Sequence, residues 1–168
     1  MRRLIVSSAC AALLMSSVGS AVAKQVCNTP TEVSAVQIRQ LQIQMMISTL
    51  RCDSSSYDFR QHYAGFMDRV NPLLPENAKL VKTMLSRTGK GGVDQYLTSM
   101  SNDAQNLSQQ DPMYCGTAVQ VLEQVAMMDT KDVPAFAAQT IPSPYQVTAC
   151  QDKPEPTPKN KGHKKHAP

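Results

Sequence analysis

The sequence lacks the closely spaced cysteine pairs that mark many metal and haem sites. Zinc sites that use cysteine usually include a C-x-x-C-like pair, and haem attachment uses C-x-x-C-H. In this chain the nearest cysteines after Cys10 are Cys27 and Cys52, which are 25 positions apart. We therefore expect no metal centre built on the cysteines, and we predict no cofactor.

Histidine is also scarce, because His62 is the only one between residues 24 and 150. A cysteine nucleophile needs a base within reach, most often a histidine. Cys52 lies ten residues before His62, but no recognisable catalytic motif surrounds either residue. The turn "TGKGG" at 88–92 lacks the phosphate-loop pattern, and the carboxylates are spread along the polar faces of the predicted helices. We predict a protein that is not an enzyme, and a thiol enzyme using Cys52 and His62 remains a remote alternative.

Only one long apolar stretch is present, and it lies at the N-terminus. Arg2 and Arg3 precede an apolar and small-residue stretch over 4–19, and Ala21–Ala23 has the small-x-small form of a signal-peptidase site. This pattern predicts a signal peptide over 1–23, cut after Ala23, and export to the periplasm. No later stretch approaches the roughly 20 apolar residues of a membrane span, so we expect no transmembrane segment in the mature chain.

A basic excess is missing from the body of the chain. Residues 24–150 carry ten lysines and arginines against eleven aspartates and glutamates, so nucleic-acid binding by this region has no support. The proline-rich stretch 151–168 is different, because it is basic and has almost no apolar residues, which predicts a disordered tail. Its lysines are candidates for contact with an anionic envelope polymer or surface: Lys153, Lys159, Lys161, Lys164 and Lys165.

What the chain does have is a recurrent helical pattern without strand signals. "TPTE" at 29–32 has the form of a capping box, with Pro30 in the first helical position, and apolar residues then cover more than one face up to about Leu50. The same reasoning predicts further helices near 57–73, 75–85, 93–107 and 111–128, with Ser54, Ser55 or Ser56 capping the second. We predict an all-α bundle of about five helices over 24–150, and a short sixth over 131–139.

Loss of Cys10 with the signal peptide leaves four cysteines, an even number that in an exported domain predicts two disulfides. Cys27 and Cys52 flank a helix of about 20 residues, whose ends are about 30 Å apart, so they are poor partners for each other. Two connectivities stay open. One is nested, with Cys52 bonded to Cys115 and Cys27 to Cys150. The other joins Cys27 to Cys115 and Cys52 to Cys150.

Several short motifs resemble those of an uncharacterised family of small exported helical proteins of alphaproteobacteria. The motifs are "RQLQIQMMISTLRC" (39–52), "YDF" (57–59), "DQYLTSMSND" (94–103) and "YC" (114–115), and the likeness covers roughly residues 27–129. The two motif cysteines of that family match Cys52 and Cys115, so the resemblance implies the nested pairing, which we favour. It implies no catalytic residues and does not extend to the lysine-rich tail.

These observations predict a non-enzymatic periplasmic protein that acts as a binding or scaffold module at the cell envelope. Its partner would be an envelope protein or an anionic envelope polymer. The alternative is a periplasmic chaperone or inhibitor that presents an apolar groove, for which adaptable methionine side chains are suited. Most methionines lie within apolar segments, so we interpret them as core residues rather than metal ligands.

Overall fold

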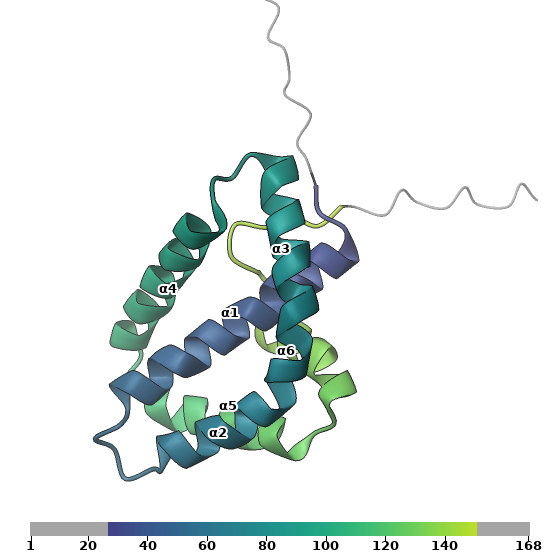
Figure 1. The fold of residues 1–168 in the computed structure, drawn as a ribbon. Coiled ribbons are helices and arrows are strands. Elements are labelled where there is room, and N and C mark those ends of the chain that lie inside the picture. The colour runs from purple at the N-terminus through teal and green to yellow at the C-terminus, as the bar shows by residue number, and fades with distance from the viewer. Residues whose placement is uncertain (1–26, 151–168) are drawn as a thin grey trace, which may run out of the picture.

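The computed structural model describes residues 27–150 and confirms the all-α fold class with two disulfides. The predicted signal peptide, the tail and its five lysines lie outside the described residues. The helices are arranged as a compact bundle (Figure 1). Their bounds are α1 Pro30–Arg51, α2 Phe59–Val70, α3 Leu74–Thr88, α4 Val93–Gln110, α5 Tyr114–Met127 and α6 Val133–Thr140. Short 3₁₀ turns occupy Asn71–Leu73 and Thr130–Asp132.

The first helix begins with the predicted capping box. The main-chain amide of Glu32 donates to the hydroxyl of Thr29 at 3.3 Å, and the amide of Thr29 donates to the Glu32 carboxylate at 2.8 Å. Pro30 occupies the first turn, where its missing N–H costs no hydrogen bond. The start of α1 is therefore determined by local sequence.

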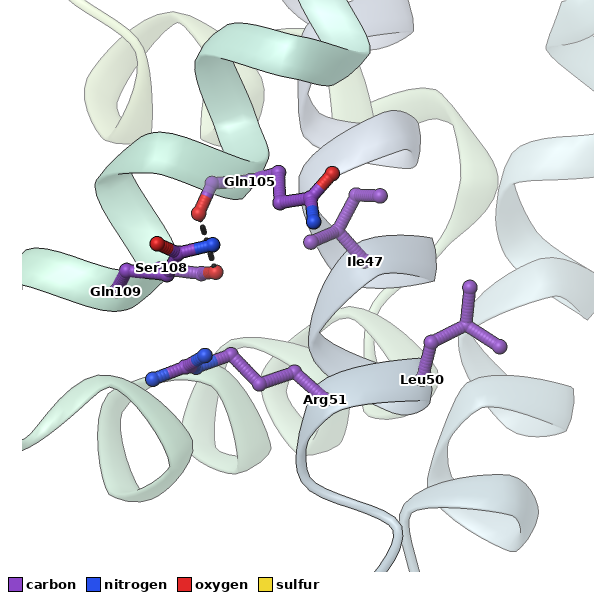
Figure 2. A pocket seen from close by; sticks show the side chains of 6 residues that line it. All are labelled: Ile47, Leu50, Arg51, Gln105, Ser108 and Gln109. Carbon is purple, nitrogen blue, oxygen red and sulfur yellow. Dashed lines mark hydrogen bonds between the residues drawn. The ribbon is translucent and has the colours of Figure 1, made fainter.

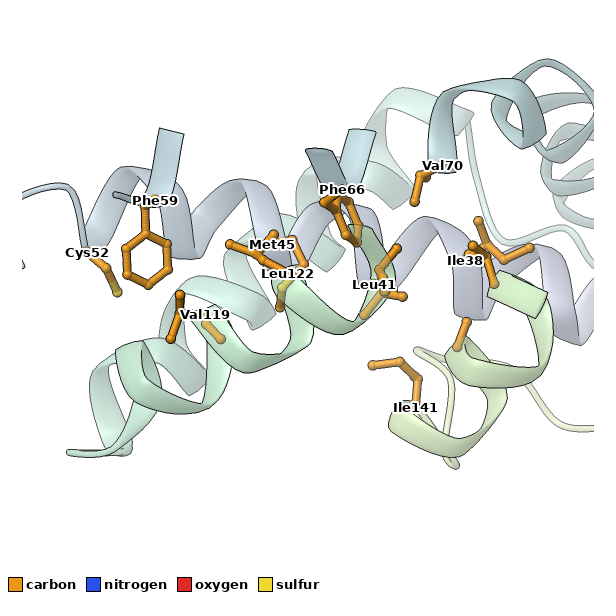
Figure 3. Close-up of a cluster of buried hydrophobic side chains, with 14 residues drawn as sticks. Ile38, Leu41, Met45, Cys52, Phe59, Phe66, Val70, Val119, Leu122 and Ile141 are labelled. Atoms are coloured by element: carbon orange, nitrogen blue, oxygen red, sulfur yellow. The ribbon is translucent and has the colours of Figure 1, made fainter. Parts of the chain in front are cut away.

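Helix α1 is central because its apolar residues divide between two separate cores. On one side, Leu41 and Met45 pack with residues of α2, α5 and α6, among them Phe66 and Leu122 (Figure 3). The other core joins α1 to α3 and α4. Its members are Ala35, Val36 and Ile43 with Val81, Met84, Leu85, Tyr96, Met100 and Ala104. The broad apolar distribution seen in the sequence thus reflects burial on two sides.

The second helix begins later than predicted and has a different cap. Helix α2 begins at Phe59 rather than near residue 57, and the side chain of Asp58, not one of the three preceding serines, accepts from the amide of Gln61 at 3.2 Å. An aspartate at this position accepts a hydrogen bond from an otherwise unpaired amide, and its negative charge is stabilised by the positive end of the helix dipole. Pro72 interrupts the α-helix, and a 3₁₀ turn leads into α3.

The connection between α3 and α4 uses glycine for a conformational reason. Gly89, the residue after α3, has φ of 66°, a left-handed conformation that disfavours side chains with a Cβ. The chain then reverses and places α4 beside α1 (Figure 1).

No helix within residues 27–150 is long and apolar enough to cross a membrane.

Residues 141–150 run back along α1. Polar side chains of α1 hold this segment in place. The buried side chain of Gln37 donates to the carbonyl of Ile141 at 2.9 Å. The side chain of Gln40, also buried, accepts from the amide of Tyr145 at 2.8 Å. These two glutamines therefore serve tertiary structure, which a helical pattern alone does not reveal.

Candidate functional site

The two disulfides are nested. Cys27 is bonded to Cys150, with Cα atoms 4.7 Å apart, and Cys52 is bonded to Cys115, with Cα atoms 5.8 Å apart. The connectivity that joins Cys27 to Cys115 is thus not the one found. The first bond connects the ends of the described chain, and the second connects the end of α1 to the first turn of α5.

The surroundings of Cys52 do not assemble a thiol site. Its side chain is 1% exposed, and its sulfur is bonded to that of Cys115, so it presents no thiolate in this structure. His62 instead lies beside α5, with its Nε2 atom 3.6 Å from the carboxylate of Glu123. The structure therefore does not bring Cys52 and His62 together as a nucleophile and its base.

The methionines of the described chain range from buried to exposed. Met45, Met84 and Met100 are buried in the two cores, as the sequence predicts. Met113 and Met127 are 70% and 80% exposed, so the interpretation as core residues does not hold for these two. Among the residues that the structure describes, no three His, Cys, Asp or Glu side chains gather in a metal-binding arrangement.

One end of the molecule joins the first and last described residues, and we call it the terminal end (Cys27–Glu32, Arg87 and Tyr145–Cys150). Next to the disulfide, the amide of Asn28 donates to Thr148 and the amide of Cys150 donates to the carbonyl of Asn28, each at 2.9 Å. The side chain of Asn28 donates to the same Thr148 carbonyl at 3.0 Å. This end is therefore closed by main-chain pairing as well as by a covalent bond.

Arg87, on the last turn of α3, connects three parts of the terminal end. Its guanidinium donates to the Glu32 carboxylate at 2.7 Å, to the side-chain oxygen of Asn28 at 3.2 Å and to the carbonyl of Cys27 at 3.0 Å. Burial alone would raise the pKa of Glu32, but the hydrogen bonds from Arg87 and Thr29 outweigh burial and hold this pKa below its ordinary value. Glu32 is thus a charged group whose Oε2 atom accepts from Arg87 and from the amide and the hydroxyl of Thr29.

The opposite end of α1 borders a cavity that we call the α1–α4 groove. Its volume is about 420 Å³, and its lining comes from the last turns of α1 and α4: Ile47, Leu50, Arg51, Gln105, Ser108 and Gln109. Figure 2 shows the side chain of Gln105 reaching from α4 toward Ile47, and Arg51 extending from α1 toward the α4 side. The hydrogen bond drawn among these six runs from the hydroxyl of Ser108 to the carbonyl of Gln105, at 2.6 Å.

Four exposed apolar side chains belong to helix ends that lie close to this groove. Leu50, Tyr57, Leu107 and Met113 are between 46% and 72% exposed, and they lie where α1 and α4 end and where α2 and α5 begin. Figure 1 shows these four helix ends together at the lower left. We call this region the groove end (residues 47–59 and 105–115). Apolar side chains that gather on an otherwise polar surface are typical of interaction sites.

The polar groups of the groove end are only partly paired. Arg51 is the only charged residue that lines the groove. Nearby, Arg60 forms a bidentate pair with Asp53 at 2.8 and 2.9 Å. Tyr114 donates to the carbonyl of Gln44 at 3.2 Å, and burial raises the pKa of its hydroxyl. The groove therefore combines one available cation with amide groups and two aliphatic side chains.

Sequence reasoning identified the cysteines but not the groove. Leu50 and Leu107 belong to different helices and occupy positions that a helical pattern assigns to the apolar face. These two leucines are exposed because of the way α4 packs on α1. The local sequence pattern does not contain this information, so it could not have predicted their exposure. No protein-family model matches this chain, and no curated protein or solved structure shows significant similarity to it.

Proposed function

We propose that this protein is an exported, non-enzymatic binding module that uses its groove end to hold a partner at the cell envelope. The observation that carries this proposal is the co-location of the α1–α4 groove with the exposed side chains of Leu50, Tyr57, Leu107 and Met113. A monomer gains nothing in stability from leaving such side chains exposed, whereas a partner that covers them removes apolar surface from water.

The two disulfides support an oxidising compartment, and together with the predicted signal peptide they favour the periplasm. The described chain ends at Cys150, at the terminal end, which α1 separates from the groove end by about 33 Å of helix. A tail that begins there and contacts an anionic polymer through its lysines would leave the groove end available. Anchoring and partner binding are thus assigned to opposite ends of one domain.

A photo-crosslinking amino acid at position 110, an exposed site at the end of α4 next to the groove lining, tests the binding role in living cells. The matched control carries the same amino acid at position 82, an exposed site on α3. We expect a discrete crosslinked envelope protein from position 110 alone, and we expect Leu50→Ser to weaken this crosslink several-fold. The same adducts from both positions, or no adduct from either, would contradict the proposal.

The tail is tested separately by fractionating envelopes from cells that express the full mature chain or a chain ending at Cys150. We expect the full chain to sediment with the envelope at low salt and to be released at high salt, since screening weakens attraction between exposed charges. The shorter chain should stay in the soluble fraction. Equal solubility of both chains at low salt would remove the anchoring role and leave the groove proposal intact.

The second candidate, a chaperone or inhibitor that presents an apolar groove, is favoured by the same exposed leucines. The lining argues for a more selective site, because four of its six residues are polar and a surface for many unfolded chains needs a broad apolar area. Suppression of the aggregation of a reduced model protein would support the chaperone. A protein that neither suppresses aggregation nor binds a hydrophobic dye would exclude it.

A further inference from the structure

The lining of the α1–α4 groove has the chemistry of a site for an extended peptide. We propose that the groove binds a polypeptide segment in which an acidic side chain lies next to apolar ones. The carboxylate would pair with Arg51, the peptide main chain with the amides of Gln105 and Gln109, and the apolar side chains with Ile47 and Leu50. This inference rests on the proposed binding function and specifies its ligand.

Arg51 is the reason for an acidic ligand. It is exposed, it is the only charged residue in the lining, and the ion pairs found within residues 27–150 engage Arg60 and Arg87 but not Arg51. A guanidinium presents planar donors that match both oxygens of a carboxylate, which makes such pairs directional as well as strong. The cation is therefore placed to select a negatively charged group.

The two glutamines are the reason for a peptide main chain. Gln105 and Gln109 are four residues apart on α4, so they lie on one face of the helix, one turn apart. Each side-chain amide can donate and accept, and a peptide main chain presents both kinds of group in alternation. The hydroxyl of Ser108 already donates to a main-chain carbonyl, so the glutamines are the main polar contacts that α4 offers.

The small share of apolar residues in the groove lining argues against a lipid chain as the ligand. Sites for such ligands are lined mostly by apolar side chains that bury the chain. Here Ile47 and Leu50 are the only apolar members of six, and the exposed Leu107 lies on α4 beside its polar positions. The volume of about 420 Å³ is within the range of roughly 300 to 1,000 Å³ for ligand sites, enough for a short segment.

The test titrates disulfide-bonded mature protein, labelled with ¹⁵N, with an octapeptide blocked at both ends that carries two leucines and one glutamate. A second peptide replaces the glutamate with glutamine. We expect the first peptide to shift the side-chain amide signals of Gln105 and Gln109. Arg51→Gln should weaken that binding about tenfold, because a charge-assisted hydrogen bond is lost. Lys82→Gln, which removes an exposed charge from α3, should leave it unchanged.

A double-mutant cycle tests whether the peptide carboxylate pairs with Arg51, because the losses of binding energy from two paired groups are not additive. The glutamine peptide should bind the wild-type protein about tenfold more weakly than the glutamate peptide, and Arg51→Gln should then cause little further loss. Independent, additive losses would overturn the assignment of the carboxylate to Arg51. Dodecanoate, a fatty acid, tests the alternative that the groove binds a lipid chain. If it shifts the same signals in an Arg51-dependent way while the peptides do not, the peptide assignment is wrong.

The crosslinking at position 110, which leaves every lining residue in place, distinguishes failure of the peptide assignment from failure of the binding function. Absence of peptide binding with a persistent, Leu50-dependent crosslink would overturn the peptide chemistry and leave the binding module standing. Absence of both would overturn both proposals.

Discussion

The terminal end and the groove end each carry a disulfide, yet they satisfy their other groups in different ways. At the terminal end the polar side chains of Asn28, Glu32 and Arg87 bond to one another and to main-chain groups. At the groove end, Leu50 is 72% exposed and Arg51 has no carboxylate partner within the described chain. A covalent bond alone therefore does not decide which surface is closed and which remains open for a partner.

The largest expected effect is loss of a disulfide, and the physical origin of that loss should differ between the two ends. The chain-entropy model gives about 4 kcal/mol for the loop closed by Cys52 and Cys115 and about 5 kcal/mol for that closed by Cys27 and Cys150. Replacing the first pair with alanine also removes a buried sulfur from the core around Phe59, whereas the second lies outside both cores. We expect this added packing loss to make the two variants comparable in urea unfolding. If the variant without Cys27 and Cys150 lost about 0.6 kcal/mol more, the difference that the two loop lengths give by themselves, the packing of the Cys52 sulfur would contribute nothing.

Glu32→Gln should remove the ion pair with Arg87 that helps to hold the terminal end together. We expect a loss of about 1 to 3 kcal/mol in the free energy of unfolding at pH 7, because Arg87 loses its charged acceptor. The folded-state pKa of Glu32 is lowered, so its stabilisation is fully present above the ordinary pKa of 4.5 and is lost as the pH falls through the folded value. Wild type and variant should therefore converge in stability below that window. A constant difference down to strongly acid pH would contradict the role of the charge.

Two tyrosine hydroxyls give a matched comparison of the ends. Tyr96 donates to the carbonyl of Tyr145 at 2.6 Å and so holds the returning segment, whereas Tyr114 donates at 3.2 Å to the carbonyl of Gln44, which already accepts from Ser48. We expect Tyr96→Phe to cost about 1 kcal/mol and Tyr114→Phe clearly less. Thermal unfolding of both variants measures this, and the reverse order would show that the groove end is the better bonded.

The smallest effect on stability should come from the exposed leucines. Leu50→Ser combined with Leu107→Ser should change the free energy of unfolding by less than about 0.5 kcal/mol, because neither side chain loses much buried area. Binding of a hydrophobic dye should fall. Met127→Ser, at the far end of α5, is the control for an equally exposed apolar residue outside the groove end. A large destabilisation by the leucine changes would mean that they support the fold rather than a partner.

The sequence could predict interactions between residues that are close along the chain, but not those between residues that are far apart along it. The start of α1 was predictable because Thr29, Pro30 and Glu32 act within one turn. Its double-sided burial followed from its apolar breadth, and two disulfides followed from the cysteine count. The contacts of Arg87 join residues 55 to 60 positions apart, and Gln37 and Gln40 reach residues more than 100 positions away. No local pattern encodes such partners, and the groove likewise exists only once α4 packs on α1.

The bond between Cys27 and Cys150 makes the domain a covalent ring. Within this ring, the bond between Cys52 and Cys115 forms a second, smaller loop of chain. A single cut by a protease in the connection at Gly89–Gly92 would thus open the peptide chain without releasing a fragment. Both pieces would remain joined by the two sulfur bridges until a reductant reached them. In an oxidising compartment, where reductants are scarce, this topology would preserve the molecule after a cut in this exposed turn.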